Sequence, residues 1–355
     1  MAFAPGYSDD EAQLLISLAA FAYVDETPLQ GETPAQQTAR MRKDIDTSLK
    51  GLPTPGWEVV WGPGIGLDRG NMLYVAGNST TNQYAVAVRG TDWSFWLDWL
   101  EDFASMLPLV PFAYVLPRSS NPPLIRIALG TSLGLDELIA IQGADASGTN
   151  STLGQFLATL PATSDIFVTG HSLGGCLASV VAAWAAHALG GAARVKAYTF
   201  AAPSAGDAGF ASYYNALFTD TTPGLSTAFR VYNTLDFVPN AWASLAHVDT
   251  YYQPKPLAPE DIKLLVSEAI KIVGAEYVQV GTKAAGSEHP LPGQVIPWNS
   301  FIGNLDPTGN VEYAHQVGEQ HATATYMRLL AAQPHMAATV KLSAMSARRR
   351  GQYGG

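Results

Sequence analysis

The chain has 355 residues, 47% of them hydrophobic, which is enough to bury the core of one large α/β domain. Its formal net charge is −10 at pH 7 and its one cationic cluster is Arg348-Arg349-Arg350, so it lacks the basic surface that nucleic-acid binding requires. No apolar run approaches the roughly 20 residues that cross a bilayer, which excludes a transmembrane segment. We expect a single domain over residues 1–333 and a flexible tail over residues 334–355.

The N-terminus and the cysteine content bear on localisation and on disulfide bonding. Residues 1–11 lack the charged and apolar segments of a secretory signal peptide. The cytoplasm is therefore the default expectation, and export of a processed form stays open. Cys176 is the only cysteine, which excludes an intrachain disulfide.

Helix and strand patterns begin early in the chain. A capping segment at residues 8–11 predicts an amphipathic helix that runs to Val24 and packs on a sheet. Three strands are predicted after it, at Trp57–Trp61, Asn71–Ala76 and Gln83–Val88. The last two are joined by a turn and form a hairpin.

Residues 92–130 are a candidate cap over an apolar pocket. Residues 93–103 hold three tryptophans and two phenylalanines, and residues 106–129 are apolar but broken by five prolines. The plain alternatives are an amphipathic helix with a core stripe, followed by a buried connection.

The second half of the chain alternates between strands and helices. Helices are predicted at residues 133–141, 151–160, 176–189, 259–273 and 312–332, and strands at residues 166–168, 195–200, 228–233 and 277–280, with a loop over residues 281–298. Strand, helix and strand around residue 172 form a βαβ unit. The predicted fold class is therefore α/β, with a mostly parallel central sheet flanked by helices.

Gly170-His-Ser-Leu-Gly174 lies between the strand and the helix of that unit. A G-x-S-x-G sequence in this context predicts a sharp turn that exposes the Ser172 hydroxyl at a helix N-terminus, where developing negative charge is stabilised. A chance match in a chain with 33 glycines is the alternative. The flanking strand and helix favour Ser172 as a nucleophile.

A serine nucleophile needs an imidazole to take its proton and a carboxylate to orient that imidazole. Asp236 follows the second strand after Ser172 and is the preferred acid. Asp207 is the second choice, although its place before Ala208 favours a helix cap. Asp249 is a turn carboxylate and a weak candidate.

His321 is the preferred base and His315 the alternative, because both lie in the last predicted helix. Gly318 favours a break that would place His321 at the start of the final helix. Next to the nucleophile, His171 is either a structural residue of the turn or a substrate contact. The other candidates are structural or surface residues, namely His187, His247 and His289.

An oxyanion hole needs two donors. The backbone N–H of Leu173, directly after the nucleophile, predicts the first. Thr91 follows the strand that ends at Val88, and its N–H and hydroxyl make it the candidate for the second.

Five segments together resemble the class 3 lipases. They are Val-Arg-Gly-Thr at 88–91, Val-Thr-Gly-His-Ser-Leu-Gly-Gly at 168–175, Thr-Phe-Ala-Ala-Pro-Ser-Ala-Gly-Asp at 199–207, Tyr-Asn-Thr-Leu-Asp-Phe-Val-Pro at 232–239 and His-x4-Tyr at 321–326. The resemblance implies an α/β-hydrolase fold with a lid after the oxyanion-hole strand. It also implies Ser172, Asp236 and His321 as the triad. A serine-hydrolase mechanism of this kind needs no metal or cofactor.

The implied activity is hydrolysis of acylglycerol esters, with transient contact to a lipid–water interface. Candidate substrate contacts are Trp93, Phe95, Trp96 and His171. A carboxylesterase, a feruloyl esterase, a phospholipase A1 or an acyltransferase would use the same triad. An inactive hydrolase fold that only binds a partner is the alternative from another class.

Overall fold

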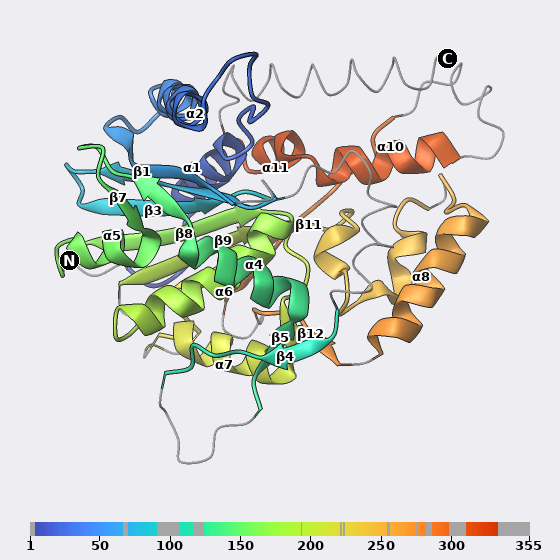
Figure 1. The fold of residues 1–355 in the computed structure, drawn as a ribbon. Coiled ribbons are helices and arrows are strands. Elements are labelled where there is room, and N and C mark those ends of the chain that lie inside the picture. Colours follow the sequence, from blue (N-terminus) through green and yellow to red (C-terminus); the bar gives the residue numbers. More distant parts are fainter. Residues whose placement is uncertain are drawn as a thin grey trace.

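The computed structural model describes residues 4–66, 70–90, 107–116, 124–192, 194–220, 222, 224–253, 256–274, 276–281, 286–297 and 310–332. Its centre is a seven-stranded sheet in the order β1-β2-β3-β8-β9-β11-β13 (Figure 1). The strands are β1 (Trp57–Ile65), β2 (Met72–Asn78), β3 (Gln83–Val88), β8 (Asp165–His171), β9 (Val195–Phe200), β11 (Ala228–Asn233) and β13 (Glu288–Leu291). The pairs β1–β2 and β2–β3 are antiparallel. The remaining pairs, β3–β8, β8–β9, β9–β11 and β11–β13, are parallel. The predicted mostly parallel α/β sheet is confirmed.

Helices cover both faces of the sheet (Figure 1). One face carries α4 (Leu129–Ala140), α5 (Leu153–Thr159), α6 (Leu173–Ala188) and α7 (Ala208–Phe218). The other carries α1 (Asp9–Phe21), α2 (Pro34–Leu49) and α11 (Thr323–Leu329). This arrangement explains the continuous apolar run in β8, because Ile166 and Val168 face the first group of helices and Phe167 the second.

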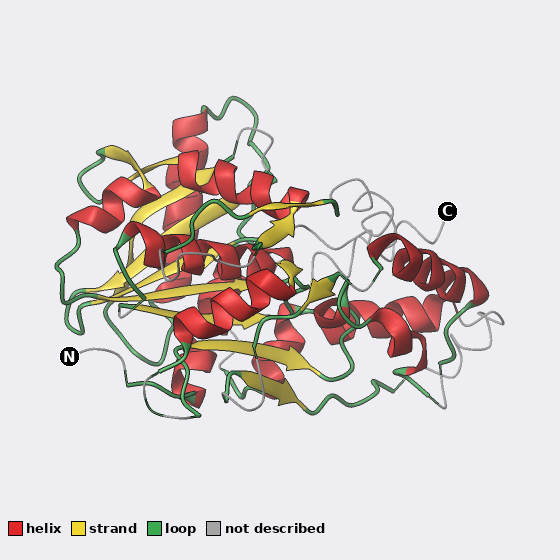
Figure 2. Cartoon of the chain, turned by 90° about the horizontal axis from the view of Figure 1, so that it is seen from below, coloured by secondary structure: helices red, strands yellow, loops and turns green. Residues whose placement is uncertain are grey.

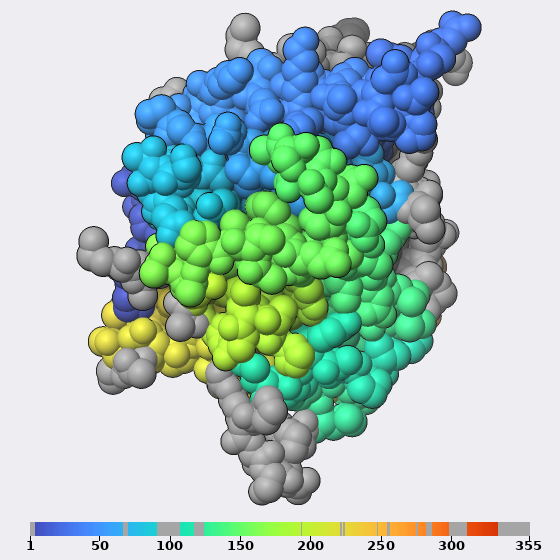
Figure 3. All heavy atoms as spheres, turned by 60° about the vertical axis from the view of Figure 1, so that its left-hand side comes forward, coloured from blue at the N-terminus to red at the C-terminus, as the bar shows by residue number. Residues whose placement is uncertain are grey.

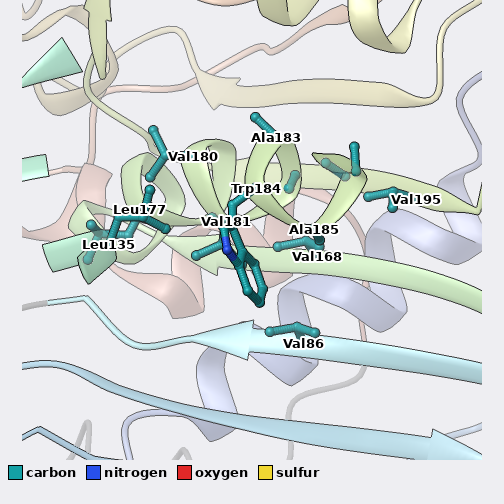
Figure 4. Close-up of a cluster of buried hydrophobic side chains, with 14 of the residues drawn as sticks. Val86, Leu135, Val168, Leu177, Val180, Val181, Ala183, Trp184, Ala185 and Val195 are labelled. Atoms are coloured by element: carbon teal, nitrogen blue, oxygen red, sulfur yellow. The ribbon is translucent and has the colours of Figure 1, made fainter. Parts of the chain in front are cut away.

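The helix α6 packs closely on the centre of the sheet. Its buried face is rich in alanine, which lets the helix approach the strands. Figure 4 shows Val181 and Trp184 of this helix beside Val168 and Val86 from two neighbouring strands. The packing fixes the start of α6, and with it the G-x-S-x-G turn, against the sheet.

A second sheet of four short strands lies beside α7, in the order β12-β10-β5-β4. Its strands are β4 (Leu109–Pro111), β5 (Arg126–Ala128), β10 (Gly206–Asp207) and β12 (Tyr277–Val278). The described parts of the candidate cap, 107–116 and 124–130, belong to this sheet and to the start of α4. Phe112 among them is buried in the main core. The remainder of the candidate cap lies outside the described residues.

A hairpin of β6 (Gln142–Ala144) and β7 (Asn150–Thr152) packs against the N-terminal part of the chain (Figure 3). Arg42 of α2 joins the two. Its Nη1 donates to the carbonyls of Ala144 at 2.9 Å and Gly62 at 3.1 Å. The guanidinium thereby satisfies backbone acceptors that the edge strand leaves open.

A third apolar cluster lies at one end of the sheet, around α8 (Glu260–Val273) and α10 (Asn310–His321) (Figure 2). Two short 3-10 turns complete it, Val238–Asn240 and Leu245–Thr250. The cluster matters for the site because it anchors α10, the helix that ends at His321. No described helix has the length and hydropathy that would let it span a bilayer.

Several elements differ from the sequence predictions, among them the short strands β4 to β7 and β10. α2 was not expected, although Thr33 and Gln36 form a capping box at its start. The loop predicted over 281–298 contains β13, a four-residue edge strand whose Pro290 is tolerated because it lies at the edge. The single last helix predicted over 312–332 is two helices, α10 and α11, separated at Ala322.

Candidate active site

Ser172 stands on a strained turn between β8 and α6. Its backbone has φ 63° and ψ −132°, a conformation that residues with a side chain rarely adopt. Two close approaches require glycine on either side of it: a Cβ at Gly170 would lie 2.2 Å from Gly174 O, and one at Gly174 would lie 2.4 Å from Val88 O. The predicted G-x-S-x-G turn is therefore present.

The Ser172 side chain is fully buried at the N-terminus of α6. Its Oγ makes no hydrogen bond to the described residues. The backbone is fixed, since Ser172 N donates to Phe200 O at 2.9 Å and Ser172 O accepts from Gly175 N at 2.9 Å. A buried hydroxyl in this position is costly unless it serves a purpose, because such groups are normally paired.

Asp236 follows β11 and is fully buried. Its Oδ2 lies 2.8 Å from His321 Nδ1 and accepts a hydrogen bond from the Tyr326 hydroxyl at 2.7 Å. Its Oδ1 accepts from Val238 N at 3.0 Å. The carboxyl group thus accepts three hydrogen bonds, from Tyr326, from Val238 N and from the Nδ1–H of His321. The structure therefore brings together the acid and the base preferred from the sequence.

His321 reaches this position in a different way from the one expected. α10 does not break at Gly318 but continues to His321, and the chain turns at Ala322 before α11 begins. The prediction that His321 starts the final helix is wrong: it is the last residue of the preceding one. Gly318 stays helical because Tyr313 and Val317 of α10 are buried in the third apolar cluster, which outweighs the helix penalty of glycine.

The imidazole of His321 is oriented by the contact with the acid. Because the carboxylate of Asp236 accepts from Nδ1–H, Nε2 is the nitrogen left to exchange a proton with a neighbour. The ring is 3% exposed and lies 4.7 Å, centroid to centroid, from the ring of His171. His321 is thus next to the residue that precedes Ser172.

His171 is buried and belongs to the structural framework of this site. Its Nε2 lies 2.8 Å from His321 O; since a carbonyl only accepts, Nε2 carries the proton. Burial, and secondarily the nearby His321, lower the pKa of His171 well below the usual value, so the ring is neutral. The Tyr23 hydroxyl lies 3.4 Å from its Nδ1 and donates to the carbonyl of His171 at 3.2 Å. These contacts support the structural reading of His171 that the sequence left open.

Tyr326 is a site residue to which the sequence assigned no role. Its hydroxyl donates to Asp236 and accepts from Asn233 N at 3.0 Å. Burial and the neighbouring Asp236 hold its pKa well above the usual value, so the hydroxyl keeps its proton. The His-x4-Tyr pattern at 321–326 was the available signal.

The oxyanion-hole candidates are described only in part. Leu173 is the first residue of α6, where backbone N–H groups have no partner within the helix. Thr91 lies outside the described residues, as do Trp93, Phe95 and Trp96. The residue before Thr91 is described and lies against the turn, because a Cβ at Gly90 would be 2.7 Å from His171 O and 3.0 Å from Gly174 N.

The alternative acids and bases lie elsewhere. Asp207 caps α7 by accepting from Phe210 N at 2.9 Å, as its position predicted. His289 stacks on Tyr7 and His187 is exposed near the end of α6, while Asp249 lies in a 3-10 turn. His315 is half-buried one and a half turns before His321, and the side chain of His247 is not described. Within the described ranges, no three His, Cys, Asp or Glu side chains form a group that could hold a metal ion.

Comparison with known proteins finds similarity to lipases. Residues 85–245 match the model of the family described as lipase (class 3). This part of the chain is similar to the class 3 lipases. The match includes Ser172 and Asp236 but ends before His321.

Two solved lipase structures are similar over more of the chain. The crystal structure of M37 lipase superposes with a TM-score of 0.73 at 25% identity, covering 93% of this chain and 96% of that one. Lip2 lipase from Yarrowia lipolytica gives a TM-score of 0.50 at 17% identity, with 83% and 84% of the chains covered. The fold is therefore the α/β-hydrolase fold of these lipases.

Among curated sequences, lipase ZK262.3 of Caenorhabditis elegans is 28% identical over 243 residues, which are 66% of this chain. The same region is 55% of the worm protein, so the chain spans about half the length of that relative.

Proposed function

We propose that this protein is a serine hydrolase that cleaves the carboxylic esters of acylglycerols through an acyl-enzyme intermediate. The observation that carries the proposal is the 2.8 Å contact between His321 Nδ1 and Asp236 Oδ2, buried beside the strained turn of Ser172. An acid–base pair of this geometry next to a serine at a helix N-terminus is the arrangement that activates a hydroxyl nucleophile.

In the proposed reaction Ser172 Oγ attacks the ester carbonyl while His321 Nε2 takes its proton. Asp236 stabilises the imidazolium, and the N–H groups of Leu173 and Thr91 stabilise the oxyanion. His321 returns the proton to the leaving alcohol. Water then attacks the acyl-enzyme with His321 again as base, which releases the carboxylic acid and restores Ser172.

The nucleophile is tested by Ser172→Ala on p-nitrophenyl esters. We expect at least about a 10³-fold loss of kcat with the fold intact, because the covalent route is lost. Ser179→Ala is a matched control, since Ser179 lies on the same helix and its hydroxyl donates to Cys176 O at 2.6 Å. Full activity of Ser172→Ala, or labelling of another residue by a fluorophosphonate, would reject the proposal.

The identity of the base is tested by substituting two histidines of the same helix, one at a time. His321→Ala should lose activity to a similar extent as Ser172→Ala, whereas His315→Ala should turn over at nearly the wild-type rate. The reverse result would move the role of base to His315.

The substrate class is tested by a panel of esters. A triacylglycerol lipase should hydrolyse emulsified triolein and gain rate when short-chain triglycerides pass their solubility limit. Preference for soluble short-chain esters without that gain would identify a carboxylesterase instead. Preference for feruloyl esters or for the sn-1 ester of phosphatidylcholine would identify a feruloyl esterase or a phospholipase A1. Products formed in aqueous alcohol separate hydrolysis from acyl transfer.

A further inference from the structure

The end of α10 leaves backbone carbonyls that need donors. The last four carbonyls of an α-helix have no partner within it, and α10 ends at His321, inside the protein. Water does not reach this place freely, because Gln320 is 1% exposed and His321 3% exposed. A carbonyl without a hydrogen bond here would destabilise the fold, so the groups that donate to these carbonyls should fix the end of the helix.

The carbonyl of Gln320 is held by Asn233. Asn233 Nδ2 donates to Gln320 O at 2.9 Å and to Gln320 Oε1 at 2.8 Å. Its Oδ1 accepts from Leu235 N at 3.1 Å, next to the acid Asp236. Asn233 is fully buried and is the last residue of β11. One amide thus joins the strand that carries the acid to the backbone beside the base.

The carbonyl of His321 itself is held by His171. His171 Nε2–H donates to His321 O at 2.8 Å, and His171 precedes Ser172 at the end of β8. The strand that carries the nucleophile is thereby joined to the backbone of the base. Neither contact involves the side chain of Ser172, His321 or Asp236.

The side-chain N–H groups of Gln316 and Gln320 hold α10 to a segment outside the sheet. Gln316 Nε2 donates to Ile296 O at 2.6 Å, and Gln320 Nε2 donates to Gln294 O at 2.8 Å. These fix the helix to residues 294–296, a segment without regular structure. The register of His321 against the two catalytic strands depends on other contacts.

We propose that His171 and Asn233 are positioning residues for ester hydrolysis, which set the imidazole of His321 by holding the two carbonyls at the end of its helix. The inference rests on the proposed function. Proton transfer in such a site requires the base within hydrogen-bond distance of the nucleophile, and a displacement of about 1 Å can cost 10²-fold in rate. Substrate binding does not depend on this register, so the effect should fall on kcat.

The role of His171 is tested by a pair of variants. His171→Gln keeps an N–H at the place of Nε2, whereas His171→Leu removes it. We expect His171→Leu to lose about 10- to 100-fold in kcat at an unchanged KM, and His171→Gln to restore most of it. Each kcat is expressed per active site, counted by complete titration with a fluorophosphonate. Loss of folded protein then does not change the measured kcat.

His289 offers a matched control, because its Nε2 lies 2.8 Å from a backbone carbonyl, that of Gly286, on the edge strand β13. His289→Leu removes the same kind of contact and should keep the wild-type kcat per titrated site. An equal kcat loss in His289→Leu and His171→Leu would show a general effect of destabilisation and overturn the inference.

The role of Asn233 is tested in the same way. Asn233→Asp keeps the acceptor for Leu235 N but removes the donor to Gln320 O. Asn233→Ala removes both groups and adds no charge. Both should lower kcat per titrated site by about 10-fold or more. The control is Asn78→Asp, because the buried Asn78 Nδ2 also donates to a backbone carbonyl, that of Pro55, at 3.0 Å.

The outcomes separate this inference from the proposed function. If the wild type neither hydrolyses esters nor reacts with the fluorophosphonate at Ser172, the proposed function is wrong and the inference falls with it. If the wild type is active while His171→Leu and Asn233→Ala keep its kcat, only the inference is overturned. A kcat loss in both, with rescue by His171→Gln, supports it.

Discussion

The hydroxyl of Tyr326 lies 2.7 Å from Asp236 Oδ2, the same oxygen that faces His321 Nδ1 at 2.8 Å. Tyr326 comes from α11 and His321 from α10, so the turn between these helices brings two donors to one carboxylate oxygen. The carboxylate lies away from water, and hydrogen bonds from charged or polar donors compensate the cost of burying its charge.

Tyr326→Phe should weaken both the site and the fold. The substitution removes one donor from Asp236 and leaves Asn233 N without its acceptor, which is costly in a buried place. We expect the free energy of unfolding to fall by about 1–3 kcal/mol and kcat by about 10-fold. Urea denaturation and kcat on a p-nitrophenyl ester measure the two effects.

Tyr74→Phe is the control for this substitution. Tyr74 is also fully buried, and its hydroxyl donates to Leu18 O of α1 at 2.7 Å, not to Asp236. The Tyr74→Phe variant should be less stable than the wild type, while its kcat stays at the wild-type value. Equal kcat in Tyr326→Phe and Tyr74→Phe would show that the Tyr326 hydroxyl does not act on the acid.

Gly174→Ala tests the geometry of the nucleophile turn. The added Cβ would lie 2.4 Å from Val88 O and 2.6 Å from Gly90 N, and backbone atoms cannot move aside as a side chain can. We expect little folded protein, or a loss of about 3 kcal/mol or more in the free energy of unfolding. Soluble yield and urea denaturation measure this. At Gly191 a Cβ meets nothing within 4 Å, so Gly191→Ala should be close to the wild type; a similar result at Gly174 would contradict the close packing of the turn.

The nucleophile turn and the strands around it could be predicted from the sequence because their signals are local. Gly170 and Gly174 mark the turn, and the apolar runs of β3, β9 and β11 have the bounds that were predicted for them. Asp236 followed from its place after a strand. Local patterns suffice where the backbone itself dictates the residue type.

The surroundings of the base could not be predicted in this way. Gly318 favours a helix break, but burial of its neighbours in the third cluster keeps α10 intact and moves the break to Ala322. The contact of His171 with His321 O joins residues 150 positions apart, and no periodicity encodes it. β13 was not predicted because it is four residues long and contains a proline. Tertiary packing decides each of these features.

Protonation of His171 should couple stability to pH. The pKa of His171 is well below the usual value because the ring is buried, so the unfolded chain binds this proton at a higher pH than the folded protein does. Stability should therefore fall as the pH drops below the unfolded pKa of about 6.5, by at most about 1.4 kcal/mol per pH unit. The pKa of His289 is also lowered, mainly by burial, and acts in the same direction.

Urea denaturation of the wild type and of His171→Gln, at about pH 7.5 and about pH 5.5, measures the coupling. In the variant the difference between the two pH values should shrink by about 1 kcal/mol, since one titrating group is gone. The part due to His289 remains. An unchanged difference in His171→Gln would contradict a depressed pKa at this position.

Glu11→Gln tests a buried ion pair that fixes α1 to the sheet. Lys196 Nζ lies 2.6 Å from Glu11 Oε2, and the side chains are 2% and 25% exposed. The same oxygen accepts from the Tyr198 hydroxyl at 2.7 Å. Removal of the carboxylate charge from a buried ammonium should cost about 2–4 kcal/mol in the free energy of unfolding, which urea denaturation measures. The exposed pair of Glu260 and Lys263, also 2.6 Å apart, gives the control: Glu260→Gln should change stability by less than about 0.5 kcal/mol, and equal losses in the two variants would show that burial does not strengthen the first pair.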